Sequence, residues 1–408
     1  MSAGTVRVCH VITRLDLGGA QENTLYTVGH LRAPFAASLV CGRGGLLDDE
    51  ASGLPVTFLP SLVRPVRPWR DLRALRDLVR LFRGERPQVV HTHSSKAGIL
   101  GRAAARLAGV PVIVHTIHGF GFNDLQPAPQ RAALVALERA AARFTTQFIA
   151  VSRANLEKGV ALGIVPRGRV RLIRSGIPVA EFEKAGRDPA LRSGRALRRE
   201  VGLPHDAPLV GMVACLKPQK DPLTFVEAAA RVAAVLPRAA FVMAGDGELR
   251  AAVQARAEAR GLKGKLRLLG WRRDMPRVMA ALDVLVLTSL WEGLPKVLPQ
   301  AIAAGVPIVA TAVDGSTDVL SDGVSGLLCA PGDAAAIASG VLRLLGDPIL
   351  GRTLAGRARA VLPEFDIDGM VRAQEDLYRE LLGAVRRPDA APREAQGGPA
   401  AKALAMKH

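Results

Sequence analysis

Short apolar runs rich in Val and Ile alternate with helix-like segments along the chain, and this pattern constrains the fold more than any other feature. The helix-like segments carry apolar residues at helical spacing, as the stretch from Leu72 to Phe82 does. The strand-like runs of the first half are Val6–Ile12, Ser38–Cys41, Val56–Leu59, Gln88–His91, Val112–Thr116, Phe148–Val151 and Val170–Ile173. Such an alternation predicts an α/β fold with a parallel sheet that helices cover on both faces.

The second half repeats the pattern. Its strand-like runs are Leu209–Cys215, Ala240–Ala244, Leu266–Leu269, Val284–Leu287, Ile308–Ala310 and Gly326–Leu328. Helices are expected at Pro222–Val235, Glu248–Arg260, Pro295–Ala303 and Ala334–Leu345. We therefore predict two doubly wound parallel-sheet domains that face each other across a cleft, with ligands at the carboxyl ends of the strands.

Composition shifts suggest where these domains begin and end. We expect a first domain over residues 1–178, a charged linker over 179–205 and a second domain over 206–362. A helix over 363–385 is expected to pack back on the first domain. Residues 386–408 are rich in Ala, Pro, Gly and charge, which predicts a disordered tail.

The charge balance indicates an anionic partner. The 408 residues include 55 Lys and Arg against 37 Asp and Glu, a net charge of +18. Aromatic residues make up only 4%, so the stacking platforms of single-strand binders are scarce and we expect no nucleic acid partner. Nucleotides, phosphorylated ligands and anionic membranes stay open.

Four cysteines, a plain N-terminus and the absence of long apolar runs bear on location. The cysteines contain no CxxC pair, which argues against a zinc site and fits a reducing cytosol. No signal peptide and no run of about 18 apolar residues is evident. We expect a cytoplasmic protein, with peripheral contact at the inner face of the cytoplasmic membrane as an alternative.

Two loops of the first half carry residues suited to a ligand. Gly18 and Gly19 follow the first strand and open a helix, where backbone N–H groups can approach an anion; a plain tight turn is the alternative. His118 lies beside glycines just past Val112–Thr116, and His91 and His93 end an earlier strand in the same way. A buried structural histidine is the alternative for each. We expect no metal site, because no thiol or carboxylate lies nearby to complete the ligands.

Two loops of the second half complete the set. Lys217 and Lys220 precede a helix whose N-terminus suits a diphosphate, although a solvated turn would look similar. The most informative string is EGLPKVLPQ, which runs from Glu292 to Gln300 at a strand-to-helix turn. Glu292 and Gln300 are placed to reach the sugar and the ribose of a nucleotide sugar. The turn between them contributes the residues Gly293, Leu294, Pro295 and Lys296.

At this point the chain resembles retaining glycosyltransferase family 4, which has the GT-B fold of two Rossmann-like domains. The string EGLPKVLPQAIAAGVPIVATAVDG is similar to the signature of that family. Seven further strings match in order, namely GGAQ, HTIHG, FIAVS, RSGI, KPQKD, AGDGELR and LLGW. The resemblance spans about residues 6–385 and implies bacterial polysaccharide or glycolipid synthesis.

The resemblance implies a role for individual residues. Gly19 matches the glycine that admits the donor diphosphate, and His118 matches a histidine near the transferred sugar. Lys220 matches a lysine that pairs with the diphosphate, and Glu292 matches a glutamate that holds sugar hydroxyls. Two positions depart from the family: Gln300 replaces the usual second glutamate, and Cys215 stands where arginine is common, so Lys217 is expected to compensate.

We therefore expect a metal-independent retaining hexosyltransferase without a cofactor. It would move a sugar from a UDP- or GDP-linked donor to a glycan or polyprenyl-linked acceptor. A catalytically silent family member and another GT-B enzyme, such as a sugar-nucleotide epimerase, are the alternatives. Residues 64–106 hold eleven basic and three acidic residues, which predicts a surface for anionic lipid or a merely solvated helix face.

Overall fold

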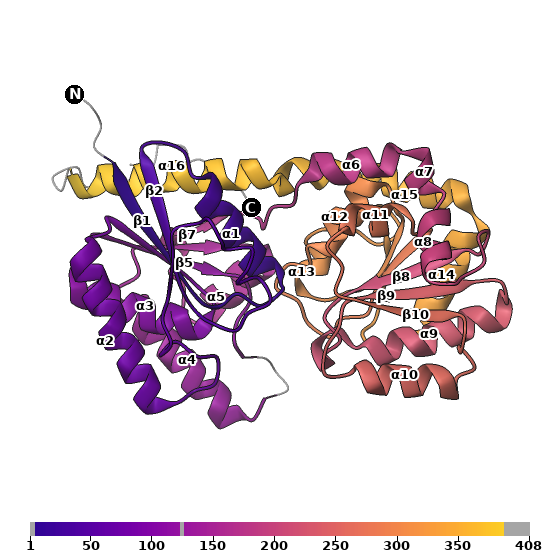
Figure 1. The fold of residues 1–408 in the computed structure, drawn as a ribbon, viewed down its shortest axis with the longest axis horizontal. Helices are drawn as coiled ribbons and strands as arrows, with labels where there is room; N and C mark the ends of the chain where they lie inside the picture. Colours follow the sequence, from indigo (N-terminus) through magenta and orange to yellow (C-terminus); the bar gives the residue numbers. More distant parts are fainter. Residues whose placement is uncertain (1–4, 123–125, 387–408) are drawn as a thin grey trace, which may run out of the picture.

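The computed structural model describes residues 5–122 and 126–386, so residues 387–408 of the expected tail lie outside the described part. Two α/β halves lie side by side, each with one sheet between layers of helices (Figure 1). The predicted fold class is confirmed, because every expected strand forms and all strand pairs within both sheets are parallel.

The sheet of the first half has seven strands in the order β3-β2-β1-β4-β5-β6-β7. Their bounds are β1 Val6–Arg14, β2 Phe35–Gly42, β3 Val56–Phe58, β4 Val89–His93, β5 Val112–Ile117, β6 Gln147–Ala150 and β7 Val170–Leu172. Its helices are α1 Gly19–His30, α2 Pro68–Glu85, α3 Ser95–Ala108, α4 Ala128–Ala142 and α5 Arg153–Ala161, with a 3₁₀ turn at Arg167–Arg169. The strand order reverses between β1 and β4, which opens a crevice at their carboxyl ends.

The sheet of the second half has six strands in the order β10-β9-β8-β11-β12-β13. Their bounds are β8 Leu209–Val213, β9 Ala240–Ala244, β10 Leu266–Gly270, β11 Val284–Leu287, β12 Ile308–Thr311 and β13 Leu327–Cys329. Its helices are α9 Pro222–Val235, α10 Arg250–Ala259, α11 Met275–Ala280, α12 Val297–Ala304, α13 Asp314–Thr317, α14 Ala334–Gly346 and α15 Pro348–Ala358, with 3₁₀ turns at Pro218–Lys220 and Arg359–Phe365. Here the order reverses between β8 and β11.

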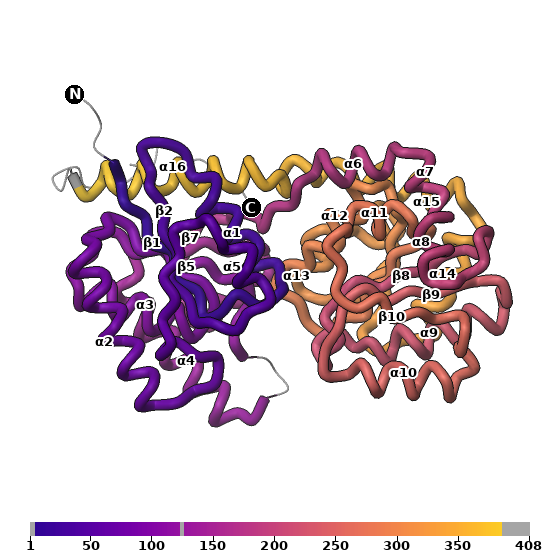
Figure 2. Tube along the Cα trace, viewed as in Figure 1, coloured from indigo at the N-terminus to yellow at the C-terminus, as the bar shows by residue number. Residues whose placement is uncertain are grey.

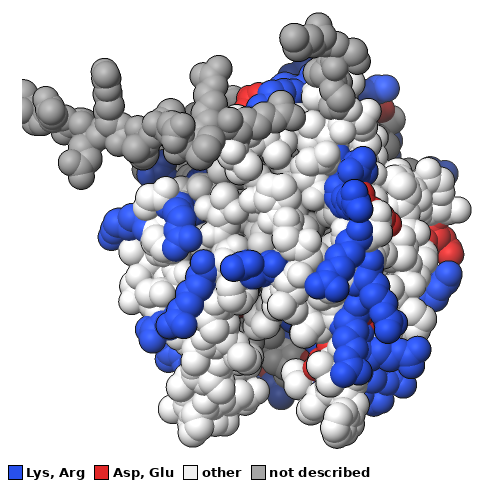
Figure 3. Space-filling view, turned by 90° about the vertical axis from the view of Figure 1, so that its left-hand side faces the viewer, with Lys and Arg blue, Asp and Glu red and all other residues white. Residues whose placement is uncertain are grey.

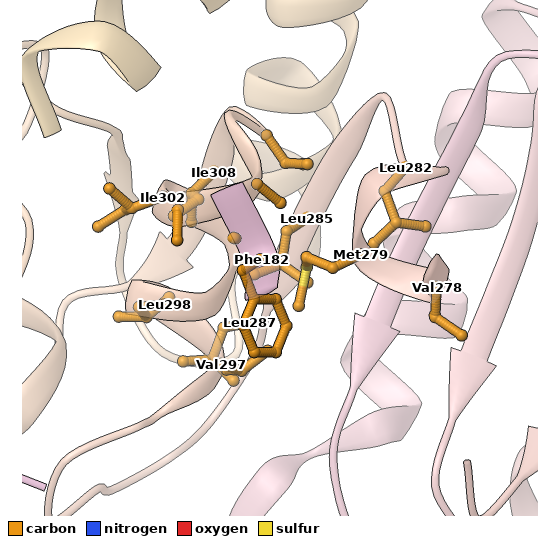
Figure 4. Close-up of a cluster of buried hydrophobic side chains, with 14 of the residues drawn as sticks. Phe182, Val278, Met279, Leu282, Leu285, Leu287, Val297, Leu298, Ile302 and Ile308 are labelled. Carbon is orange, nitrogen blue, oxygen red and sulfur yellow. The ribbon is translucent and has the colours of Figure 1, made fainter. Parts of the chain in front are cut away.

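The segment expected as a linker is built into the second half. It folds as the helices α6 Val179–Arg187, α7 Pro189–Arg192 and α8 Arg195–Glu200. Phe182 of α6 lies in the core with Leu285 and Leu287 of β11 and Val297 of α12 (Figure 4). The spacing of Phe182 and Ala185 puts the apolar side chains of α6 on one face, so the charged composition of this segment describes only its outer side.

The last helix, α16 Ile367–Arg386, returns along the first half (Figure 2). Met370, Val371, Leu377 and Tyr378 of this helix share a buried cluster with strands β1, β4 and β5 of the first sheet. The first core is therefore completed by residues from the end of the chain.

The chain crosses between the halves twice, and the two crossings lie against each other. Ile177 N–H donates to Phe365 O over 2.8 Å, and Ile367 N–H donates to Ile177 O over 3.1 Å. A Cβ on Gly176 would lie 2.4 Å from Ile367 Cα. Only glycine fits this contact without moving the backbone.

We predict that Gly176→Ala lowers the free energy of unfolding by about 1–3 kcal/mol, because the added methyl overpacks a backbone contact. Thermal and urea denaturation measure the effect. Gly168→Ala is the matched control, since a Cβ there meets nothing within 4 Å. Equal stability of the two variants would contradict the prediction.

Candidate functional site

A cleft of about 1410 Å³ lies between the halves, where the carboxyl ends of β1, β5, β8 and β11 face one another. The structure brings His118 and the predicted residues of the glycine, lysine and EGLPKVLPQ loops to this cleft, whereas His91 and His93 do not line it. Its lining includes Gly18, Gly19, His118, Cys215, Lys217, Lys220, Glu292, Gly293, Leu294, Pro295, Lys296 and Gln300. Residues that are nearly 300 positions apart in the sequence thus share one surface.

Backbone contacts between glycine loops close one side of the cleft. A Cβ on Gly293, after β11, would lie 2.0 Å from the carbonyl oxygen of His118, after β5. A Cβ on Gly315 would lie 2.3 Å from the carbonyl oxygen of Gly293. These positions require glycine because the backbone itself occupies the space of a side chain.

Glu292 is the hydrogen-bond acceptor for two polar side chains of the second half. It is 6% exposed, and its Oε1 accepts hydrogen bonds from Lys220 Nζ and, over 2.5 Å, from Ser289 Oγ. Both contacts go to the same oxygen, so within the described residues Oε2 is left as an acceptor. Lys220 uses one of three ammonium donors on Glu292, which leaves two for another anion.

Lys217 and Cys215 lie next to this pair. Burial, together with the charge of Lys220, lowers the pKa of Lys217. Burial also raises the pKa of the Cys215 thiol, so the thiol stays neutral beside the two lysines. An anion bound between Lys217 and Lys220 would relieve the repulsion between the two ammonium groups.

Lys296 links the two halves. Its Nζ donates to Glu22 Oε2 over 2.7 Å and to Asn23 Oδ1 over 2.9 Å, both on α1. A Cβ on Gly19 would lie 2.6 Å from Lys296 Cδ, so the second glycine of the GGAQ string gives this side chain its path. Lys296 was expected near a diphosphate, and the structure directs its ammonium to α1.

The ring of His118 contacts a second histidine, His93, inside the first half. His118 Nε2 lies 3.1 Å from His93 Nδ1, and His93 Nε2 lies 3.0 Å from His10 Nδ1. Burial and the charge of Lys296 lower the pKa of His118 to about 4. The imidazole is therefore neutral near pH 7.

His91 and His115 belong to neighbouring contacts rather than to the cleft. His91 ring nitrogens lie 2.6 Å from Tyr378 Oη and 2.7 Å from Thr116 Oγ1. His115 Nδ1 lies 2.9 Å from Thr92 Oγ1. Both side chains are buried inside the first sheet.

Three contacts were missed from the sequence. Ser289, Glu22 and Asn23 bind the side chains of predicted residues but were not singled out. Ser289 lies three positions before Glu292 on the same turn, and Glu22 directly follows the GGAQ string. The spacing was visible for Ser289, whereas the Lys296 contacts join positions 273 and 274 apart.

Two facing Rossmann-like sheets with a cleft between them make up the GT-B fold. The comparisons with known proteins agree. Residues 18–176 match the sequence family described as glycosyl transferase 4-like domain, and residues 194–361 match glycosyl transferases group 1.

Individual relatives extend over nearly the whole chain. An Escherichia coli protein named as UDP-Gal:α-D-GlcNAc-diphosphoundecaprenol α-1,3-galactosyltransferase is 32% identical over 92% of this chain and 97% of its own. A 2-deoxystreptamine glucosyltransferase of Streptomyces kanamyceticus is 29% identical over 77% of this chain and 82% of its own. The chain therefore belongs to the family 4-like glycosyltransferases.

A solved structure supports the same fold. Anabaena HepE, crystallised with UDP and glucose, aligns with a TM-score of 0.80 at 21% identity and covers 92% of this chain and 100% of its own.

We predict that the protein loses thermal stability as the pH falls from 7.5 to 5.5. Burial lowers the pKa of five histidines. The pKa falls to about 3 for His10 and about 4 for His118, and it lies well below the usual value for His91, His93 and His115. The unfolded chain takes up protons near pH 6.5 while the folded chain does not, so acid favours unfolding in this window.

Melting temperatures at the two pH values measure the effect, above the usual range of carboxyl titration. His115→Leu removes one of the five groups, so this variant should show a smaller drop than the native chain. An equal or higher melting temperature at pH 5.5 would overturn the prediction.

Proposed function

We propose that this glycosyltransferase moves a hexose from a UDP-sugar to a polyprenyl-diphosphate-linked glycan, with retention of anomeric configuration and without a metal ion. The observation that carries the proposal is the contact of Lys220 with Glu292 in the cleft that His118 also lines. One residue suits a diphosphate and its neighbour suits the sugar attached to it.

The donor half of the proposal draws on the second domain. Lys217 and Lys220 offer two cations to the diphosphate, and the free Oε2 of Glu292 accepts from sugar hydroxyls. Gln300 on α12 lines the cleft and would bond the ribose through its amide. The Escherichia coli relative, named for UDP-galactose, supports uracil as the base.

The reaction requires stabilisation of a leaving diphosphate. The bond between the anomeric carbon and the phosphate oxygen breaks, and its electron pair stays on the diphosphate. The acceptor hydroxyl bonds to the anomeric carbon from the same face and passes its proton to the leaving phosphate oxygen. Lys220 and Lys217 offset the growing negative charge, which is the main task of the site.

Metal independence is proposed because these cations take the place of a metal at the diphosphate. The spacing of Asp366 and Asp368 resembles an Asp-x-Asp motif, but both open α16, outside the lining of the cleft. There Asp368 Oδ1 accepts from Tyr26 Oη over 2.6 Å.

A lipid-linked acceptor fits the outer face of the first half. Basic side chains far outnumber acidic ones on this face (Figure 3). Helix α2 and the stretch before it carry seven exposed arginines, namely Arg64, Arg67, Arg70, Arg73, Arg76, Arg80 and Arg83. Trp69 is 85% exposed and Val66 is 80% exposed, so apolar anchors lie among the charges.

Two of the eleven basic residues in the stretch 64–106 are covered and ion-paired. Arg102 is fully buried and forms an ion pair with Glu138 over 2.5 Å. Lys96 pairs with Asp71 over 2.5 Å and is largely covered. The patch is therefore smaller than the sequence suggested.

We propose that this patch holds the enzyme at the inner face of the cytoplasmic membrane. Among the described residues no single helix is long and apolar enough to cross a bilayer; only the pair Ala334–Gly346 and Pro348–Phe365, bent by 104°, reaches that length and composition together. Docking would bring the first half of the protein to the membrane.

A transfer assay tests the proposed reaction. UDP-galactose, UDP-glucose, UDP-N-acetylglucosamine and GDP-mannose are each incubated with synthetic GlcNAc-diphosphoundecaprenol in EDTA, and nucleotide release is measured. We expect acceptor-dependent release of UDP and an α-linked product by NMR. No release across the panel, a β-linked product, or loss of activity in EDTA would contradict the respective part of the proposal.

In the same assay we predict that Lys220→Ala lowers kcat by about 10²–10³-fold, the usual loss for one group that stabilises developing charge. Lys263→Ala removes an exposed lysine of the same domain outside the cleft and should keep native turnover. Full activity of Lys220→Ala would show that the diphosphate site is assigned wrongly.

Co-sedimentation with vesicles tests the docking surface. Anionic vesicles should pellet the native protein in low salt, and Arg70→Glu with Arg76→Glu should weaken binding at least about tenfold, since each basic residue contributes about 1 kcal/mol near such a surface. Arg352→Glu with Arg357→Glu makes the same charge change on α15, where both residues are exposed. Equal weakening by both pairs would refute a local patch.

A further inference from the structure

Three histidines on neighbouring elements form a line from the cleft into the first sheet. His118 follows β5, His93 ends β4 and His10 lies within β1. Nε2 of His118 lies 3.1 Å from Nδ1 of His93, whose Nε2 lies 3.0 Å from Nδ1 of His10. His10 is fully buried and His93 is 3% exposed.

The inner end of this line has a definite polarity. His10 Nε2 is buried and has no hydrogen-bond partner among the described residues. A neutral imidazole carries one N–H and one bare nitrogen. An N–H without an acceptor is rarer and costlier in a protein interior than an unused acceptor, so the bare nitrogen of His10 is Nε2.

That choice fixes the proton of each following ring. With Nε2 bare, His10 Nδ1–H donates to His93 Nε2. His93 must then carry its proton on Nδ1 and donates it to His118 Nε2. His118 is left with its proton on Nδ1, for which the described residues offer no acceptor, and the side chain lines the cleft.

We propose that His10 and His93 are positioning residues that hold His118 as the Nδ1–H tautomer, so that His118 donates a hydrogen bond to an oxygen of the bound substrate. The proposal rests on the proposed function for the identity of that substrate. His118 then orients the substrate and does not take a proton from it.

The surroundings of the line favour neutral rings. Burial lowers the pKa of His93 well below its usual value and that of His10 to about 3, and Lys296 adds its charge next to His118. A protonated imidazole donates from both of its nitrogens. In this line it would face the N–H of a neighbouring ring with an N–H of its own, where an acceptor is needed.

Histidines of this region also lie close enough together for a metal site to be considered. Ligand atoms of His10, His91 and His93 lie within 4.8 Å of one another, as in a metal site. Both nitrogens of His91 already face Tyr378 Oη and Thr116 Oγ1 at 2.6 and 2.7 Å. A bound metal would have to displace these contacts and the bond from His10 to His93.

Nitrogen NMR tests the tautomer without any turnover. Protein labelled with ¹⁵N-histidine gives long-range proton–nitrogen correlations that separate the two tautomers, and His118→Asn assigns the signal. We expect Nδ1–H for His118 at pH 7.5 in the native chain and a mixture in His93→Leu. An Nε2–H signal for His118, an imidazolium, or stoichiometric metal in the purified protein would overturn the proposal.

Kinetics test the consequence. His93→Leu should lower kcat by about tenfold to hundredfold, the usual cost of losing an orienting partner, with little change in KM for the donor. His93→Asn can still donate to His118 and should recover most of that loss. His115→Leu removes a buried histidine outside the line and should keep native kcat.

The two experiments separate the two proposals. If the native chain transfers no sugar, the proposed function fails and the NMR result still decides the tautomer. If transfer occurs but His93→Leu and His115→Leu behave alike, or if His93→Asn recovers nothing, the positioning role fails while the transferase stands.

Discussion

The close approach of two glycine loops is the constraint on which the rest of this molecule depends. The backbone of Gly293 touches the carbonyl of His118, and Gly315 touches the carbonyl of Gly293, at distances that exclude any Cβ. This contact joins the two halves beside the cleft. Lys296 reaches Glu22 across the same boundary between the halves.

The cleft combines an ionised pair of the second half with a neutral histidine ring of the first half. The second half offers ionised groups, with Lys220 and Lys217 beside the Glu292 carboxylate. The first half offers a neutral ring, His118, backed by buried histidines. The ionised pair and the neutral ring thus lie in one cleft, which charged side chains of the first half also line, among them Arg14, Asp16 and Arg64.

The sequence predicted the sheets and the lining of the cleft because short-range patterns encode both. The alternation of apolar runs and helical segments predicts the strands, and loops at their carboxyl ends meet where the strand order reverses. The sequence alone therefore predicted that Gly19, His118, Lys220 and Glu292 share one cleft. Predictions from composition were wrong where the burial of a side chain determines its role. The charged stretch around α6 hides Phe182, and Arg102 counts as surface charge until its pairing with Glu138 is seen. The contacts of Lys296 depend on how the halves dock, which no local pattern encodes.

Because α16 packs on the first half, the half that is synthesised first is the one whose core is completed last. The first sheet is made early, yet its apolar face needs Met370, Val371 and Leu377 from the end of the chain. His91 likewise waits for Tyr378, its hydrogen-bond partner. During translation the first half must therefore stay partly uncovered until the second half has been made. The half that carries His118 begins the chain and is the last to close.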